Sequence, residues 1–132
     1  MKIYIKIIFA LILISFVFVR CSDFPLDDND MLITSRTDCY MSNFELLGSD
    51  QRTVLVSKII DTTALTVNAV VVYGANLKNL KPHCSLATDA SLTPSMGVWT
   101  DFSDLTNPKE YTVISGNKQI RKTYKIYLTV QP

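Results

Sequence analysis

Residues 110–130 read EYTVISGNKQIRKTYKIYLTV and carry the clearest structural pattern in the chain. Two stretches, 110–114 and 120–130, alternate apolar and polar side chains, as β-strands with one buried face do. The residues between them, SGNK at 115–118, include Gly and Asn, which tolerate the positive φ angles of tight hairpin turns. The pattern therefore predicts an antiparallel hairpin with one face in a core and the other in water.

Shorter stretches of the same kind precede this hairpin and are separated by turn-forming residues. No segment after the N-terminal apolar run shows helical periodicity, and Pro82 would end any helical turn in the connector 77–82. We therefore expect an all-β fold, an antiparallel β-sandwich of about seven strands over residues 38–132. The remaining strands are predicted at 39–46, 53–60, 65–73, 83–87, 90–93 and 99–102.

The N-terminus has the features of an export signal. Lys2 and Lys6 are basic and precede an apolar run at 7–19. The run is shorter than the ~20 residues that a membrane-spanning helix needs, so a transmembrane anchor is the second alternative. Residues 1–20 are therefore interpreted as a signal peptide.

The end of this segment resembles a bacterial lipoprotein signal, because Cys21 directly follows it. The resemblance implies cleavage before Cys21 and diacylation of its thiol; Arg20 departs from the small residue usual before such a cysteine. Residues 21–37, which begin CSDFPLDDND, have the composition of a solvated linker. They resemble the acidic tether of Bacteroidota surface lipoproteins, which implies an outer-membrane, surface-exposed location with a lipid anchor as the contact to the membrane.

Charge and cysteine content limit the function classes. Residues 1–20 hold three of the 13 basic residues and none of the 12 acidic ones, so the remainder has a net charge of −2, which argues against nucleic-acid binding. Cys39 and Cys84 either form a disulfide, which export permits, or are small buried side chains. His83 is next to Cys84 and no CxxC is present, so we expect no metal and no cofactor.

Residues 65–130 resemble a module found at the membrane-proximal end of glycan-utilisation lipoproteins of the Bacteroidota. The resemblance implies an immunoglobulin-like or cadherin-like β-sandwich of unassigned function and no catalytic residues. Those proteins usually continue into a second domain. The matching segments are VVYGANL at 71–77, LKP at 80–82, SLTPSMG at 91–97, DFS at 101–103, PKEYTV at 108–113 and YKIYLTV at 124–130.

The sequence gives little support for catalysis. His83 is the single histidine, and no G-x-S-x-G motif is present. Asp101 and Asp104 are close in sequence, but a small sandwich offers little room for the deep cleft of a glycosidase. We therefore expect a protein that is not an enzyme and has no catalytic residues.

Three functions remain open. The first is an accessory, spacer or interaction module for glycan capture. The second is direct carbohydrate binding, for which Trp99, Asp101 and Tyr127 are the candidate contacts, because sugar rings stack on exposed aromatic side chains; a buried Trp99 would exclude it. The third is a structural subunit of a surface assembly that adds a strand at a sheet edge. Thr62, within Asp61-Thr62-Thr63, resembles an acceptor of Bacteroidota O-glycosylation.

Overall fold

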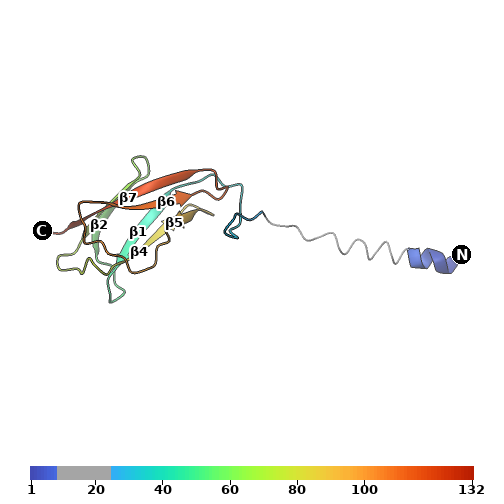
Figure 1. Cartoon of the computed structure of the whole chain (residues 1–132), viewed down its shortest axis with the longest axis horizontal. Helices are drawn as coiled ribbons and strands as arrows, with labels where there is room; N and C mark the ends of the chain where they lie inside the picture. The colour runs from blue at the N-terminus through green and yellow to red at the C-terminus, as the bar shows by residue number, and fades with distance from the viewer. Residues whose placement is uncertain (9–24) are drawn as a thin grey trace. The chain divides into compact units, whose positions relative to one another are not determined.

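The computed structural model describes residues 1–8 and 25–132 (Figure 1). The chain divides into two compact units, Met1–Leu32 and Ile33–Pro132. In the first unit, residues 2–8 are helical and Leu26 pairs with Leu32 in an isolated bridge. Most of the predicted apolar run, together with Cys21, lies outside the described residues. Within the described part of the chain, no helix has the length and apolarity required to cross a bilayer.

The second unit is a β-sandwich of seven strands, as the alternation of the sequence predicts. Each observed strand begins and ends within two residues of a predicted one. The strands are β1 (Met41–Leu47), β2 (Leu55–Asp61), β3 (Thr66–Val71), β4 (Lys81–Leu86), β5 (Ser91–Thr93), β6 (Lys109–Ile114) and β7 (Arg121–Val130).

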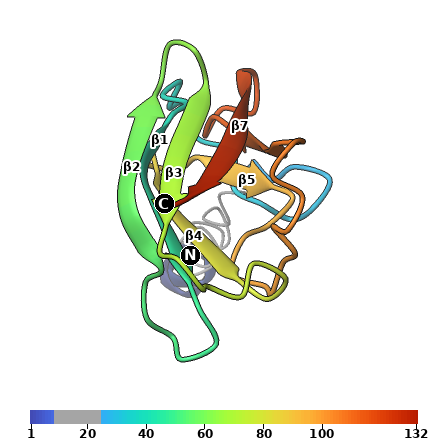
Figure 2. The same ribbon diagram turned by 90° about the vertical axis from the view of Figure 1, so that its left-hand side faces the viewer.

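The strands form two sheets, one with the order β1-β4 and one with the order β2-β3-β7-β6-β5 (Figure 2). Most neighbouring strands are antiparallel, but β3 and β7 are parallel, with Val67 opposite Ile126 and Ala69 opposite Leu128. The predicted antiparallel sandwich is therefore present, with one parallel pair that the sequence did not predict. Alternation within a strand defines its buried face but not which distant strand lies beside it.

The core lies between the two sheets and consists of the alternate side chains that point inward. Tyr124 and Phe44 are the largest side chains that are fully buried. The Tyr124 hydroxyl oxygen lies 3.3 Å from the backbone N–H of Met41 and accepts a hydrogen bond from it. This bond joins β7 to the start of β1 through the core, so that one aromatic residue connects the two sheets.

The predicted hairpin is present, and its turn also receives the beginning of the second unit. The Thr34 N–H donates to the Gly116 carbonyl oxygen, and the Asn117 N–H donates to the Arg36 carbonyl oxygen, both at 2.9 Å. Residues 33–37, assigned to the tether in the sequence analysis, therefore belong to the second unit. The last residues of this unit, Gln131 and Pro132, follow the other end of β7 (Figure 1).

Two predicted elements differ from the structure next to β4. Residues 99–102 form no strand; only Thr100 pairs, in an isolated bridge with Leu80. The strand predicted at 83–87 begins instead at Lys81 and includes Pro82. Proline is tolerated in an edge strand, where its missing N–H breaks no sheet hydrogen bond. Pro82 therefore lies within the strand with its side chain inward, and its neighbours Lys81 and His83 point outward.

Cys39 and Cys84 are both free thiols in the structure, so the disulfide alternative is not what it shows. Cys84 lies opposite Phe44 in the β1–β4 pair, whereas Cys39 precedes β1, five residues from Phe44. At about 3.3 Å per residue, the two cysteines lie roughly 16 Å apart along the strand direction. A disulfide requires Cα atoms within about 7 Å. Burial raises the pKa of both thiols.

Candidate ligand-binding surface

A short segment at 97–100 lies along the free edge of β4. The Thr100 N–H donates to the Leu80 carbonyl oxygen at 2.7 Å, and the Leu80 N–H donates back to Thr100 at 3.1 Å. Further along, the Gly97 N–H donates to the Pro82 carbonyl oxygen at 2.8 Å. The bridge pairs Leu80 with Thr100, whereas the third bond joins Pro82 to Gly97 instead of Val98, so the segment bulges at 97–98. Trp99 contacts Lys81, and Gly97 lies beside the His83 ring.

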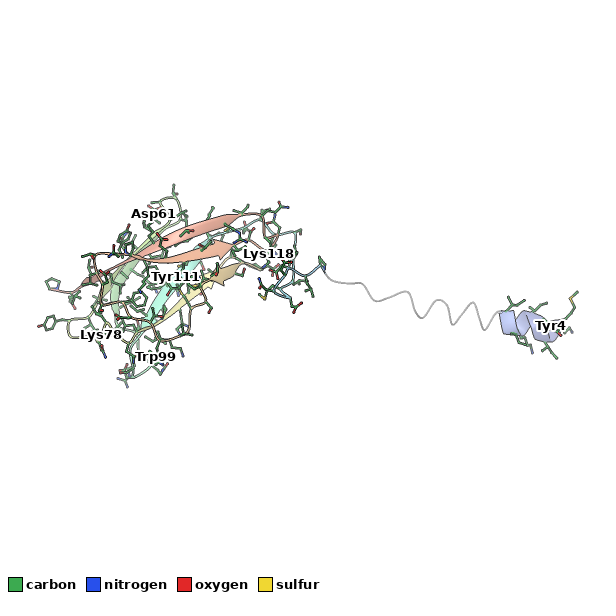
Figure 3. All side chains as sticks on the ribbon, viewed as in Figure 1. Tyr4, Asp61, Lys78, Trp99, Tyr111 and Lys118 are labelled. Atoms are coloured by element: carbon green, nitrogen blue, oxygen red, sulfur yellow. The ribbon has the colours of Figure 1, made fainter. Side chains whose placement is uncertain are left out.

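Trp99 is on the surface. The exposed fraction of its side chain is 45 %, and the neighbouring Val98 is 57 % exposed. The Lys81 ammonium lies over the indole, 5.8 Å from the ring centroid, within the range of a cation–π contact. In Figure 3, Trp99 lies on the same side of the sandwich as Lys78 and away from Asp61. The condition that would have excluded direct sugar binding, a buried Trp99, is therefore not met.

The outer face of the β1–β4 sheet continues this surface. In β4 the inward positions are Pro82, Cys84 and Leu86, so the alternate residues point outward. The strand register places His83 opposite Glu45 and Ser85 opposite Asn43. We call this surface the Trp99 face; it consists of Asn43, Glu45, Lys81, His83, Ser85 and Trp99.

Glu45 is held in place by three neighbours. Its carboxylate forms an ion pair with Lys58 of β2, and its second oxygen accepts a hydrogen bond from the Thr53 hydroxyl at 3.2 Å. The hydrogen bond from Lys58 is the main cause that lowers the pKa of the Glu45 carboxyl below its usual value, and Thr53 and Asn43 lower it further. The negative charge of Glu45 is thus balanced by Lys58 rather than by Lys81 or His83.

Asp101 lies two residues after Trp99 in the same loop. Its carboxylate accepts a hydrogen bond from the Ser103 N–H at 2.8 Å. Hydrogen bonds from Ser103 are the main cause of a lowered pKa, with smaller contributions from the charges of Lys109 and Lys78. Asp101 is exposed and shapes the loop beside the Trp99 face.

Tyr127 lies elsewhere. It is on β7, opposite Asn68 of β3, and its side chain is 38 % exposed on the outer face of the five-stranded sheet. The outer faces of two packed sheets point in opposite directions. The structure therefore brings Trp99 and Asp101 into one loop and does not bring Tyr127 to them.

Thr62 lies in the turn between β2 and β3 and is exposed. The Asp61 carboxylate accepts hydrogen bonds from the N–H groups of Thr63 and Ala64, each at 2.8 Å. These bonds from Ala64 and Thr63 lower the pKa of the Asp61 carboxyl. Asp61 therefore fixes the backbone of the turn and presents the Thr62 hydroxyl to solvent.

Sequence reasoning missed Lys81, His83 and Glu45 as parts of a common surface. It assigned Lys81 to the connector and considered His83 only as a catalytic or metal-binding residue. The signal was present in residues 81–86, where Lys, His and Ser alternate with Pro, Cys and Leu. Within residues 1–8 and 25–132, no group of three His, Cys, Asp or Glu side chains is positioned to hold a metal ion.

Solved structures that resemble this chain show the same fold at low sequence identity. A candidate glycoside hydrolase from Bacteroides thetaiotaomicron is 21 % identical, with a TM-score of 0.50 over 73 % of this chain and 24 % of its own. A candidate secreted protein from Bacteroides fragilis is 16 % identical, with a TM-score of 0.54 over 72 % of this chain and 97 % of its own.

A DUF4623 family protein from Bacteroides eggerthii is 16 % identical, with a TM-score of 0.53 over 72 % of this chain and 22 % of its own. This chain thus spans about a quarter of two of these proteins and nearly all of the third. None of the curated proteins matches the chain.

The family comparison is more specific than the structural one. Residues 45–128 match the family described as SGBP, N-terminal, and the match extends from β1 into β7. It covers the Trp99 face except for Asn43, together with the core of the sandwich except for Cys39, Met41 and Phe44. The chain belongs to the SGBP, N-terminal, family.

Proposed function

We propose that the protein is a non-catalytic lipoprotein module of the cell surface that supports glycan capture as an accessory, spacer or interaction domain. The observation that carries this proposal is membership of a family of glycan-binding-associated surface modules, across nearly the entire sandwich. The fold suits the role, because the unit begins beside the hairpin turn that precedes β7 and ends after the far end of β7. Partners attached at these two ends would be held apart by the length of the sandwich.

The test uses cells that retain fluorescent glycans at their surface. Deletion of the gene should reduce the amount of glycan retained, and the intact gene supplied in trans should restore it. Unchanged retention across a panel of glycans on which the organism grows would contradict the proposal. Enzymatic release of sugar by the purified full chain would contradict its non-catalytic part.

The proposed anchor is a lipid on Cys21, with an acidic tether at the outer face of the outer membrane; the tether expected at 21–37 ends by residue 32, because Ile33–Pro132 form the second unit. The support is the sequence: a basic N-terminus, an apolar run and a cysteine directly after it. Metabolic labelling with a fatty acid should mark the protein, and Cys21→Ala should abolish the label, whereas Cys84→Ser should not. A label that persists in Cys21→Ala would refute lipidation there.

A second candidate function is direct contact with glycan through Trp99. It is favoured by the exposure of the indole beside polar side chains, which is the arrangement that sugar rings require. Trp99→Ala should abolish the retardation of the full chain in gels that contain a bound polysaccharide. Tyr73→Ala is the matched control, because Tyr73 is an aromatic residue that is 80 % exposed at a different loop.

The third candidate, a structural subunit, is favoured by β2. This strand is an edge of the five-stranded sheet and exposes Val56 and Ile59, which are 51 % and 69 % exposed. Exposed apolar edge strands can pair with a strand of another chain. Ile59→Lys should reduce any self-association that analytical ultracentrifugation detects for the full chain; a mass that is unchanged by the substitution would contradict strand addition at β2.

We also propose Thr62 as an O-glycosylation site, supported by the exposed turn that Asp61 stabilises. The intact mass of the protein from its native host should exceed the sequence mass by that of a glycan. Thr62→Ala should remove this excess and Thr63→Ala should not. The reverse result would move the site to Thr63, and no excess mass would refute the modification.

A further inference from the structure

We propose that the Trp99 face binds an acidic sugar residue, one that carries a carboxylate or a sulfate group, with its ring on Trp99 and its anionic group at Lys81 and His83. This inference rests on the second candidate function, direct glycan contact, and specifies its ligand class. It goes beyond the candidate contacts taken from the sequence, which included neither Lys81 nor His83.

The charges of the face are the first argument. The carboxylate of Glu45 is balanced by Lys58, and Asp101 lies near Lys78 and Lys109. By contrast, none of the ion pairs formed by the described residues includes Lys81. The positive charge of Lys81 is therefore available to a ligand, and its position over the indole places it where a stacked sugar would lie.

The second argument is the spacing of Lys81 and His83 on β4. Lys81 and His83 are two residues apart on β4, so their side chains leave the same face of the strand. Trp99 contacts Lys81, and the residue beside the His83 ring is Gly97, which has no side chain to cover the imidazole; a Cβ there would lie 3.7 Å from the ring. Imidazole carries an N–H donor in both of its protonation states. The two donors thus form a pair beside the indole.

The geometry of a stacked sugar is the third argument. The carboxylate of a uronic acid, or a sulfate ester, projects from the rim of the sugar ring and not from its apolar faces. The Lys81 ammonium lies over the indole, so a sugar that stacks on this face displaces it, and the flexible lysine side chain can then reach the acidic group at the rim of the sugar ring. Charge-assisted hydrogen bonds are about twice as strong as neutral ones, so the acidic group would be selected over a hydroxyl.

The experiment compares charged polymers with neutralised forms of the same polymers. The full chain, purified in mild detergent, is run in native gels that contain polygalacturonate, chondroitin sulfate or heparin. Parallel gels contain methyl-esterified polygalacturonate, desulfated and methyl-esterified chondroitin, or desulfated and carboxyl-reduced heparin. Retardation by at least one charged polymer is expected, with an apparent affinity about tenfold above that for its neutralised form.

Matched variants separate the two contacts. Lys81→Ala should reduce the affinity for the charged polymer about tenfold and leave any affinity for the neutralised form unchanged. Trp99→Ala should abolish binding to both forms. Lys125→Ala is the control for a lost positive charge, because Lys125 lies on the other sheet and pairs with Glu110; it should bind as the wild type does.

The outcomes distinguish this inference from the functions on which it rests. Equal affinity for the charged and neutralised forms would overturn the acidic ligand and leave direct glycan contact standing. An equal loss in Lys81→Ala and Lys125→Ala would overturn the site, since it would indicate attraction by net charge alone. Failure of all the polymers to retard the chain would overturn both the acidic ligand and direct contact, while the accessory role is tested separately on cells.

Discussion

The outer faces of the two sheets are both polar, yet they differ in how their polar groups are satisfied. On the five-stranded sheet, Lys125 pairs with Glu110, and the hydroxyls of Thr112 and Thr123 are hydrogen-bonded at 2.8 Å. On the smaller sheet, the charge of Lys81 lies against an aromatic ring instead of a carboxylate. A face whose polar groups satisfy one another needs only water, whereas a face with an unbalanced cation beside an exposed ring is suited to a ligand.

The largest expected effect concerns the core on which both faces depend. Tyr124 and Tyr127 are three residues apart on β7, but Tyr124 is fully buried and Tyr127 is 38 % exposed. Tyr124→Ala should lower the free energy of unfolding by about 3–5 kcal/mol, and Tyr127→Ala by about 1 kcal/mol or less. Urea unfolding followed by circular dichroism measures both. Equal losses would mean that the inward and outward assignments along β7 are wrong.

A smaller effect is expected at two glycines with positive φ, of which only Gly97 lies beside the smaller face. Gly97 has a φ of 90° and Gly74 a φ of 85°, so an alanine at either position should cost about 1–2 kcal/mol of backbone strain. A Cβ on Gly97 would also lie 3.7 Å from the His83 ring, whereas one on Gly74 would meet nothing within 4 Å.

The two alanine variants should therefore lose similar stability but differ at the Trp99 face. Trp99 is the single tryptophan of the chain, so its fluorescence reports on this face alone. Gly97→Ala should change the emission of the folded protein, and Gly74→Ala should leave it as in the wild type. An unchanged spectrum in Gly97→Ala would show that the segment 97–100 does not depend on the conformation of Gly97.

The pH dependence of stability should show the ion pair that links the smaller face to β2. The pKa of Glu45 is lowered in the folded state, chiefly by the hydrogen bond from Lys58, so Glu45 contributes stability above its unfolded pKa of about 4.3. This contribution is lost as the pH falls through the lower, folded pKa. Because the side chain is 39 % exposed, the contribution should be only about 0.5–1 kcal/mol.

Thermal unfolding at pH 7 and at pH 3 measures this contribution. Other carboxyl groups also lose stability in acid, so the wild type and Glu45→Gln must be compared at both values. The difference in Tm between the two proteins should be present at pH 7 and shrink at pH 3. A constant difference would mean that the charge of Glu45 does not stabilise the fold.

The smallest expected effect is on the opposite face. The Lys125 ammonium and the Glu110 carboxylate are 3.7 Å apart, and both side chains are at least half exposed. Exposed pairs contribute roughly 0–1 kcal/mol, so Glu110→Gln should change the free energy of unfolding by less than about 0.5 kcal/mol. A loss above 1 kcal/mol in urea unfolding would contradict this expectation and mean that the Lys125–Glu110 pair contributes appreciably to the stability of the fold.

The sequence predicts the strands well, because the alternation of apolar and polar side chains within each strand indicates which of its residues are buried. The alternation at 120–130 predicts β7 almost residue by residue, with Tyr124 inside and Tyr127 outside. It could not predict that β3 lies parallel to β7, since 49 residues separate the two strands and their pairing depends on how the whole chain closes.

The candidate surface was less predictable from the sequence. A lone tryptophan in a turn-rich segment can lie in a core or on a surface, and only the bonds of 97–100 to β4 decide that Trp99 is exposed. Because Pro82 argued against a strand at this point, the sequence did not predict that β4 begins at Lys81 or that Lys81 contacts Trp99. Tyr127, like Trp99, is an aromatic residue that the sequence offers as a sugar contact. Tyr127 lies on β7 of the five-stranded sheet, however, whereas Trp99 lies beside β4 of the smaller sheet.

The placement of the two ends of the sandwich determines how it would respond to force. Residues 34–36 are bonded at the hairpin turn where β7 begins, and Gln131 follows the far end of that strand. Tension applied between residues 33 and 131 would run along β7, which is bonded on both sides by β3 and β6. Its hydrogen bonds would be loaded together in shear and not opened one by one, so the unit should extend little under tension applied at these two ends.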